Sequence, residues 1–201
     1  PKIAFIGAGS LGFSRRLMID ILHCPALRDT QFALMDIDAR RLDYARRAAE
    51  RIVAEQKLPA TVTVTTDRRQ AVRGADFVII MILAHGYEAI QAEVNIPARH
   101  GIDQCIADTM GPGGVFRFLR TSPMINDIAR DVAELARPGC WILNYTNPMS
   151  LLTWSAHRAV PQVKFVGLCH SVQGTTRLLA RVLDIPYEDV RYWVAGINHQ
   201  A

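Results

Sequence analysis

The opening stretch of the chain constrains its fold more strongly than any other. Residues 3–6 form an apolar run long enough for one buried strand, and residues 7–12, GAGSLG, follow directly and fit the pattern G-x-G-x-x-G. Apolar residues then recur at helical spacing as far as Leu22. A strand, a glycine turn and a helix in this order predict a dinucleotide-binding unit.

Each glycine of this turn has an expected role in binding a dinucleotide. The first permits the tight turn, the second lets a diphosphate approach the backbone, and the third lets helix and strand pack closely. The N–H groups at the start of the helix then face an anion. We expect the cofactor to bind through these residues of the turn: Gly7, Gly9, Ser10, Leu11 and Gly12.

An acidic residue ends the second expected strand. Residues 31–36 read QFALMD, and Asp36 lies 24 residues after Gly12, near the spacing of a carboxylate that binds a ribose diol. A carboxylate here disfavours the extra phosphate of NADP, so NAD is the expected cofactor. The alternative is a glycine turn that binds nothing, with Asp36 or Asp38 capping the next helix.

Strands and helices are expected to alternate along the rest of the chain. Further strands are predicted at residues 61–65, 76–83, 140–144, 163–167 and 192–197. Helices are predicted at residues 39–57, 68–73, 88–100, 115–136, 150–157 and 173–183, with a glycine-rich turn at 108–114. This alternation favours an α/β fold: a Rossmann-type, doubly wound, mostly parallel sheet like that of lactate and malate dehydrogenases. We expect residues 1–201 to form one NAD-binding domain that also begins a catalytic cleft.

Charge and cysteine content argue against several kinds of partner. The net charge is +4, and the arginines cluster on expected helices without interleaved aromatic residues, which argues against nucleic-acid binding. Since no apolar run approaches membrane-spanning length, we expect no membrane partner. The four cysteines form no C-x-x-C pair, and no signal peptide precedes the first strand, so a reducing cytoplasm is the expected location.

Two residues suited to metal binding, Cys169 and His199, each follow an expected strand. Ligands bind outside the carboxyl ends of parallel strands, so a thiolate and an imidazole brought together there could hold a divalent metal. The alternatives are a buried structural cysteine and a structural histidine. A nucleophile–base pair of Cys169 and His170 is disfavoured, because adjacent residues seldom face one another. The amide of Asn147, held extended before Pro148, suits sugar hydroxyls or a nicotinamide carboxamide.

Six motifs occur in an order that resembles glycoside hydrolase family 4. They span the chain, which makes the resemblance specific. The motifs are FIGAGS at 5–10, ALMDID at 33–38, ADTMGPGG at 107–114, NYTNPM at 144–149, GLCHSVQG at 167–174 and AGINH at 195–199. The family hydrolyses glycosides with NAD and is an exception to the usual pair of carboxylates. Its members are roughly twice as long, so the chain resembles their N-terminal half and lacks their C-terminal α+β substrate domain.

The resemblance implies roles for particular residues. Cys169 and His199 correspond to the family's two ligands of Mn²⁺, and Asn147 corresponds to its substrate-binding asparagine. Asp108 corresponds to an acid that supports the catalytic tyrosine base, which is itself expected beyond residue 201. His170 occupies the place where phospho-glycosidase members carry an aspartate that protonates the leaving group. The catalytic residues implied within this chain are therefore His170 and Asp108.

The resemblance also implies a mechanism and a substrate class. NAD⁺ takes a hydride from C3 of the sugar, the metal polarises the ketone, and loss of the C2 proton lets the group at C1 leave by elimination. Water then adds, and the hydride returns. The tetrad CHSV at 169–172 resembles the α-galactosidase, melibiase-type branch, with α-galacturonidases and α-glucuronidases as the competing branch. A small α-glycoside is the implied partner, and a homo-oligomer, a dimer or tetramer, is the implied assembly.

Two functions outside this family share part of the pattern. A plain NAD-dependent 2-hydroxy-acid dehydrogenase has the same first half of the sheet, but it needs no metal and reduces NAD on net turnover. A non-catalytic binding module is the second. Cys169 and His199 distinguish the glycosidase from the dehydrogenase, because only the glycosidase needs both side chains.

Overall fold

The structure is a computed structural model, which describes residues 1–199. The strands are β1 (Lys2–Ile6), β2 (Gln31–Met35), β3 (Thr61–Thr65), β4 (Phe77–Ile80), β5 (Trp141–Asn144) and β6 (Lys164–Gly167). The helices are α1 (Leu11–His23), α2 (Ala39–Glu55), α3 (Arg68–Val72), α4 (Gly86–Arg99), α5 (Gly111–Leu135), α6 (Met149–Ala159) and α7 (Ser171–Leu183). Two short 3-10 turns, η1 (Pro25–Leu27) and η2 (Tyr187–Asp189), follow α1 and α7.

The strands form one six-stranded parallel sheet in the order β3-β2-β1-β4-β5-β6. β1 lies between β2 and β4, so that Ile6 pairs with Met35 on one side and with Ile80 on the other. The chain builds the sheet outward through β3, then crosses back to β4 and builds it in the other direction. This order confirms the predicted Rossmann-type, doubly wound fold and puts the change of direction between β1 and β4.

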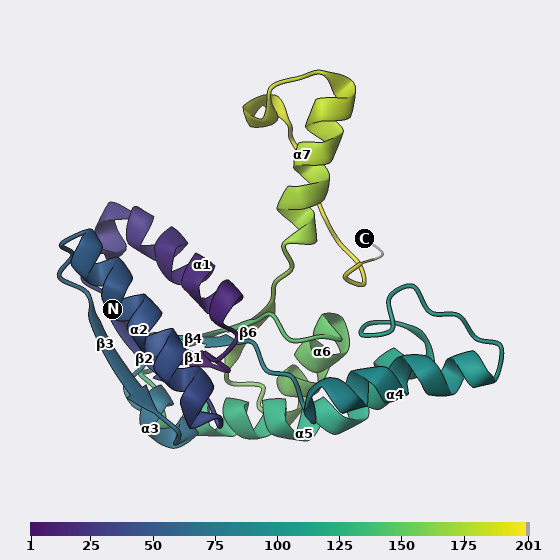
Figure 1. Ribbon diagram of the computed structural model, residues 1–201, viewed down its shortest axis with the longest axis horizontal. Coiled ribbons are helices and arrows are strands. Elements are labelled where there is room, and N and C mark those ends of the chain that lie inside the picture. The colour runs from purple at the N-terminus through teal and green to yellow at the C-terminus, as the bar shows by residue number, and fades with distance from the viewer. Residues whose placement is uncertain (200–201) are drawn as a thin grey trace.

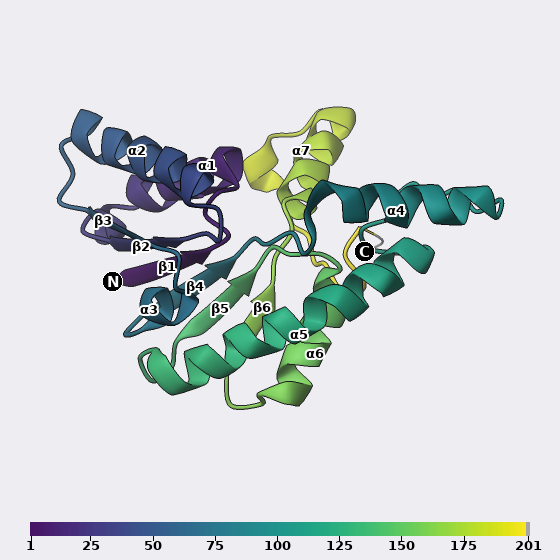
Figure 2. The same ribbon diagram turned by 60° about the horizontal axis from the view of Figure 1, so that its bottom comes forward.

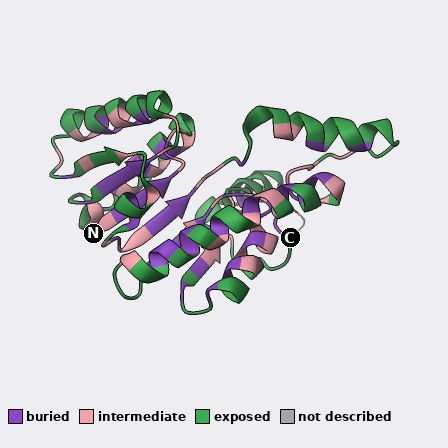
Figure 3. Ribbon diagram, turned by 90° about the horizontal axis from the view of Figure 1, so that it is seen from below, coloured by how far each residue is buried: buried purple, intermediate pink, exposed green. Residues whose placement is uncertain are grey.

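Helices cover both faces of the sheet (Figure 1, Figure 2). On one face Phe5 packs in a cluster with Met18 of α1, and on the other Ile6 packs with Ile125 of α5 and Leu152 of α6. Because both faces are buried at the centre of the sheet, β1, β2 and β4 read as apolar runs in the sequence, whereas the edge strand β3 has no buried residue. Figure 3 shows buried positions concentrated in the strands and on the helix faces turned toward them, whereas most of α4 is exposed.

The glycine turn after β1 requires two of its three glycines. Gly7 has φ +92°, and a Cβ atom there would lie 2.5 Å from the carbonyl oxygen of Met81. At Gly9 a Cβ would lie 2.6 Å from Oδ2 of Asp36. The expected packing role of Gly12 is wrong, since a Cβ there would meet nothing within 4 Å. Gly12 lies in the exposed first turn of α1 and does not face the strand.

The expected strand at residues 192–197 is also wrong, because this segment has no strand partner among the described residues. Its aromatic and β-branched residues suggest a strand, but the described sheet ends at β6. Trp193 is 88% exposed. A strand needs a neighbouring edge as well as a suitable composition, and this segment instead runs beside α7 toward the C-terminus (Figure 1).

The predicted glycine-rich turn at residues 108–114 is partly helical. α5 begins at Gly111, earlier than expected, with Pro112 in its first turn. Proline is favoured there because its missing N–H would have no partner inside the helix. A Cβ atom at Gly113 would lie 2.6 Å from the carbonyl oxygen of Ala107, so the glycines let the preceding loop lie directly on the helix.

The last described helix projects from the rest of the molecule (Figure 1). α7 carries several exposed apolar side chains, including Leu178, Leu179, Val182 and Leu183. Among residues 1–199, none of the helices has both the length and the apolar character needed to cross a bilayer.

Replacing Gly7 should destabilise the protein, whereas the matched change at Gly12 should not. We expect Gly7→Ala to lower the free energy of unfolding by about 2 kcal/mol or more, because it combines a left-handed backbone with a collision against backbone atoms. Gly12→Ala should be neutral or stabilising by up to about 1 kcal/mol, since alanine is the better helix former. Urea denaturation followed by circular dichroism measures both. Equal effects of the two changes would contradict this account of the turn.

Cys140 should be protected from alkylation in the native protein. Burial, with a smaller contribution from the Asp76 carboxylate, raises the pKa of Cys140 to about 11. Only the thiolate reacts with iodoacetamide, so at a pH of about 8.5 Cys140 should stay unmodified while the exposed Cys24 and Cys105 react. Peptide mass spectrometry measures this, and unfolding in denaturant should expose all three thiols. Labelling of native Cys140 as fast as Cys24 would refute the prediction.

Candidate active site

One cavity of about 890 Å³ lies where the strands end. Segments that follow β1, β2, β4, β5 and β6 line it, so it occupies the edge of the sheet that the sequence pattern predicts. The expected site residues on its wall are Gly7, Ser10, Asp36, Asp108, Asn147, Cys169, His170 and His199. Three further expected residues, Gly9, Leu11 and Gly12, do not line it. The role of Gly9, Leu11 and Gly12 in cofactor binding therefore stays a prediction.

Asp36 faces the glycine turn at one end of the cavity. Its Oδ2 accepts a hydrogen bond from the backbone N–H of Gly9 at 2.7 Å, and its Oδ1 accepts one from the N–H of Asp38 at 2.9 Å. The helix cap is the other acid: Asp38 accepts from the N–H groups of Arg40 and Arg41 at the start of α2. The hydrogen bond from Arg41 lowers the pKa of Asp38. Because Asp38 caps α2, the Asp36 carboxylate is free to bond to the glycine turn, where a nucleotide-binding site has its acidic residue.

Asp108 is the centre of a hydrogen-bonded group at the other end of the cavity. Its Oδ2 accepts from Nδ2 of Asn147 at 2.8 Å, and its Oδ1 accepts from the hydroxyl of Thr109 at 2.9 Å. His199 reaches the same hydroxyl, with Nδ1 2.8 Å from Oγ1 of Thr109. Asn198 donates from Nδ2 to Oδ1 of Asn147 at 2.9 Å. Residues from three distant parts of the chain therefore form one connected group.

Cys169 lies just beyond β6, at the start of α7. Its Sγ donates to Oγ of Ser171 at 3.2 Å and accepts from the backbone N–H of Ser171 at 3.4 Å. The sulfur thus bonds with Ser171 and makes no pair with His170. This geometry agrees with the expectation that Cys169 and His170 are not a nucleophile and its base.

Cys169 and His199 line the same cavity. Within residues 1–199 no group of three or more histidine, cysteine or acidic side chains is placed to hold a metal. Two protein ligands would leave positions for oxygen donors, which manganese prefers. Beside His199, the buried Oδ1 of Asn198 has no hydrogen-bond partner in the described part of the chain. The donor set therefore fits a loosely held divalent cation.

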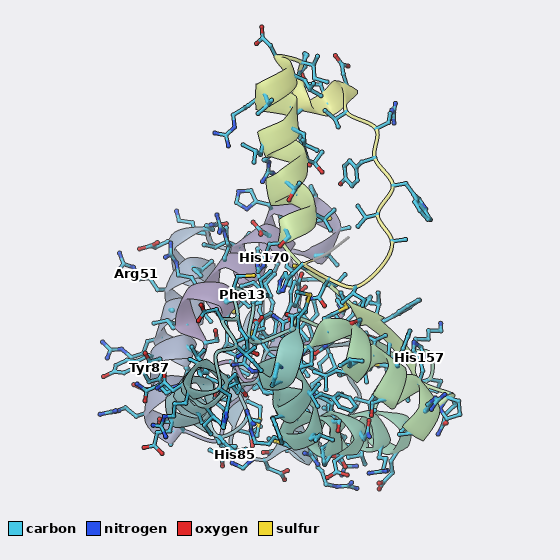
Figure 4. The ribbon with its side chains drawn as sticks, turned by 90° about the vertical axis from the view of Figure 1, so that its right-hand side faces the viewer. Phe13, Arg51, His85, Tyr87, His157 and His170 are labelled. Atoms are coloured by element: carbon cyan, nitrogen blue, oxygen red, sulfur yellow. The ribbon has the colours of Figure 1, made fainter. Side chains whose placement is uncertain are left out.

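His170 belongs to an aromatic cluster on the cavity wall. Its ring centroid lies 4.7 Å from that of Phe13 and 5.6 Å from that of Tyr145. Figure 4 shows Phe13 and His170 side by side at the base of α7, with His157 on a distant part of the surface. Burial raises the pKa of Tyr145, and the carboxylate of Asp20 and the thiol of Cys169 add to the effect. The exposed imidazole of His170 is thus in contact with two rings.

A buried ion cluster next to Asp108 is not evident from the sequence. Glu93 of α4 accepts hydrogen bonds from Arg117 and Arg120 of α5, with Nε of Arg117 at 2.8 Å from its Oε2. Nη1 of Arg117 also lies 3.9 Å from Oδ2 of Asp108. Burial lowers the pKa of Arg117, and Asp108 opposes that shift. No local signal reveals this cluster, because Glu93 looks like any acidic residue of an amphipathic helix.

Comparison with known proteins identifies the family. The profile of the family described as "Family 4 glycosyl hydrolase" matches residues 2–185. An α-galactosidase of Rhizobium meliloti (strain 1021) is 43% identical over 199 residues, which are 99% of this chain and 40% of that protein. An α-galacturonidase of Thermoanaerobacterium saccharolyticum is 37% identical over 205 residues, covering 98% of this chain and 44% of that protein.

A solved structure has the same fold over nearly the whole of this chain. The 6-phospho-β-glucosidase of Thermotoga maritima, determined with manganese, NAD⁺ and glucose-6-phosphate, is 25% identical with a TM-score of 0.84, over 98% of this chain and 46% of that one. The chain thus spans less than half the length of these relatives. Because the profile match runs through nearly all of its residues, the chain belongs to the family 4 glycosyl hydrolases.

Proposed function

We propose that the full-length protein hydrolyses α-galactosides with NAD and a divalent metal, by oxidation, elimination, addition and reduction. The observation that carries this is that one cavity is lined both by Gly7 and Asp36 and by Cys169 and His199. Hydrolysis by direct protonation of the glycosidic oxygen would call for two carboxylates and no dinucleotide turn. The similarity to an α-galactosidase, and to a structure that holds both manganese and NAD⁺, supports the same conclusion.

The glycine turn and Asp36 are the proposed cofactor site. The first turn of α1 would bind the diphosphate through its N–H groups, and Asp36 would accept hydrogen bonds from the ribose diol. Cys169 and His199 are the proposed metal ligands. When bound, NAD would supply a reversible hydride acceptor, and the metal, Mn²⁺ or another divalent ion, would supply a Lewis acid for the sugar oxygens.

The remaining residues would bind the sugar and move protons. The amide of Asn147 keeps one N–H and one lone pair beyond its bonds to Asp108 and Asn198, enough to bind a sugar hydroxyl. Asp108 would hold this amide and support the base, a tyrosine expected outside residues 1–201. His170, in contact with Phe13 and Tyr145, would donate a proton to the leaving oxygen.

The galactoside assignment within the family depends on a short stretch of sequence. The CHSV tetrad at residues 169–172 resembles the α-galactosidase branch. Identity to the R. meliloti α-galactosidase is 43%, against 37% for the T. saccharolyticum α-galacturonidase. An α-galacturonidase or α-glucuronidase is therefore the second candidate. A plain 2-hydroxy-acid dehydrogenase is disfavoured for two reasons. The chain belongs to the family 4 glycosyl hydrolases, and Cys169, which a dehydrogenase does not need, lines the same cavity as the glycine turn.

The proposal extends to the setting of the full-length protein. Residues 1–201 would form its NAD-binding domain and one side of its catalytic cleft, with the substrate domain supplied by further chain. A homo-oligomer, dimer or tetramer, would be the working assembly. A thiol ligand must stay reduced, which favours the cytoplasm.

Cofactor dependence tests the function directly. We expect the full-length protein to release p-nitrophenol from p-nitrophenyl α-galactoside faster than from the α-galacturonide, and only with NAD⁺, a divalent metal and thiol present. NADH should not accumulate, because the hydride returns to the sugar in each turnover. Faster cleavage of the galacturonide would move the assignment to the second candidate, and stoichiometric NADH formation would favour the dehydrogenase.

A matched pair of cysteine variants tests the metal assignment. Cys169→Ser should lower α-galactoside hydrolysis by about 100-fold or more, since a metal ligand is harder to replace than the outer groups that tune it. Cys105→Ser, at an exposed cysteine that does not line the cavity, should keep parent activity. Initial rates at saturating NAD⁺ and Mn²⁺ measure both. Full activity of Cys169→Ser would remove this residue from the site.

A further inference from the structure

Buried Thr109 joins a carboxylate and an imidazole that both line the cavity. Its Oγ1 lies 2.9 Å from Oδ1 of Asp108 and 2.8 Å from Nδ1 of His199. Oδ1 of Asp108 and Nδ1 of His199 are themselves 3.9 Å apart, which is too far for a hydrogen bond. Thr109 is 5% exposed, so little water competes for its hydroxyl. The hydroxyl is therefore the link between the two groups.

The number of hydrogens available determines which group donates in each of the two hydrogen bonds of Thr109. A hydroxyl has one hydrogen to donate, and an ionised carboxylate has none. The bond between Thr109 and Asp108 therefore uses the hydrogen of Thr109. The contact with His199 can then be a hydrogen bond only if the ring donates from Nδ1. In a neutral imidazole this leaves Nε2 with a free lone pair.

We propose that Thr109 is a positioning residue that fixes the tautomer of His199, with the proton on Nδ1 and Nε2 open to a divalent cation. The tautomer itself follows from the hydrogen bonds alone. Its use in binding a cation rests on the proposed function. Metal-ligating histidines in general donate their other ring N–H to an acceptor, which fixes the ring for coordination, and here a hydroxyl backed by a carboxylate would be that acceptor.

The surroundings hold Thr109 in place. Its backbone N–H donates to the carbonyl of Ile106 at 3.1 Å. A Cβ atom at Gly114 would lie 2.5 Å from the carbonyl carbon of Thr109, so the loop packs directly on the first turn of α5. A larger residue at position 114 would displace the backbone of Thr109. The glycine-rich motif thus allows the start of α5 to form and also positions Thr109 beside the imidazole of His199.

Asp108 is held equally firmly on its other oxygen. Oδ2 accepts from Asn147 at 2.8 Å and lies 3.9 Å from the guanidinium of Arg117. Arg117 is in turn fixed by buried Glu93. Because donors and a positive charge face Oδ2, Oδ1 is left to accept from Thr109. The two oxygens of one carboxylate thus connect the proposed sugar-binding amide to the proposed metal-binding ring.

The test compares Thr109→Val, which keeps the shape and removes the hydroxyl, with Thr109→Ser, which restores the hydroxyl. Thr176→Val is the matched control, because Thr176 is also 5% exposed and, within residues 1–199, its hydroxyl bonds only to a backbone carbonyl, that of Val172 at 2.7 Å. Each change is made in the full-length protein labelled with ¹⁵N-histidine. His199→Ala identifies the ring signals.

The first readout is the tautomer of His199 in the metal-free protein, from two-bond ¹⁵N–¹H correlations. We expect Nδ1 to carry the proton in the parent protein, in Thr109→Ser and in Thr176→Val, and the Nε2-protonated form to appear in Thr109→Val. An unchanged tautomer in Thr109→Val would overturn the inference. If that variant does not fold, Asp108→Asn decides the matter. Because Asn147 donates to the position of Oδ2, an amide at position 108 would place its oxygen there and its NH2 toward Thr109, which frees the hydroxyl hydrogen to donate to Nδ1 of His199. We then expect the Nε2-protonated form, and an unchanged tautomer would again overturn the inference.

The second readout is Mn²⁺ affinity, measured by the electron paramagnetic resonance signal of the free ion. Thr109→Val should bind Mn²⁺ about 10–100-fold more weakly than the parent protein, with Thr109→Ser and Thr176→Val close to it. Parent affinity in Thr109→Val, together with weak binding in His199→Ala, would contradict the inference and leave the proposed function intact. Parent affinity in His199→Ala would instead contradict the metal site of the proposed function, while the tautomer readout still decides the role of Thr109.

Discussion

The parallel pairing of β1 with both β2 and β4 is the constraint on which the rest of the structure depends. Because every strand runs in the same direction, each segment that leaves a strand does so at the same edge. Backbone hydrogen bonds continue the pairing past the strand ends: Gly7 donates to Met35, and Tyr145 to Ile80. The glycine turn and the residues that follow β5 and β6 are thereby brought to one cavity, although they lie far apart in the sequence.

Buried charge holds the far end of this cavity. Two guanidinium groups, of Arg117 and Arg120, share the carboxylate of Glu93, and the carboxylate of Asp108 stands near Arg117. Together these groups have balanced formal charge, which reduces the cost of removing them from water. We attribute to this cluster the placement of Asp108, because an ion pair between α4 and α5 fixes how the intervening loop approaches the cleft. Oε1 of Gln104 adds a second tie, accepting from the N–H of Gly113 at 2.9 Å.

Local patterns predict most of the fold, and contacts between distant residues account for what they miss. The first strand, its glycine turn and Asp36 follow from residue type and spacing, and so do the strands that directly precede Asn147 and Cys169. The expected strand at 192–197 fails because pairing depends on a distant edge. The link between Thr109 and His199 joins residues 90 positions apart, and no spacing rule reveals it. The roles of the site residues came from the resemblance to a family, and local pattern alone left the metal site as one alternative among several.

If one cleft holds both the dinucleotide and the cation, the reactive end of the dinucleotide must lie next to the cation. Paramagnetic relaxation by Mn²⁺ tests it most directly, because the effect falls steeply with distance. In the full-length protein with NAD⁺ and Mn²⁺ bound, the account predicts strong broadening of the nicotinamide proton signals and much weaker broadening of the adenine signals. The difference should vanish in Cys169→Ser. Equal broadening at both ends, or none at the nicotinamide, would contradict the account.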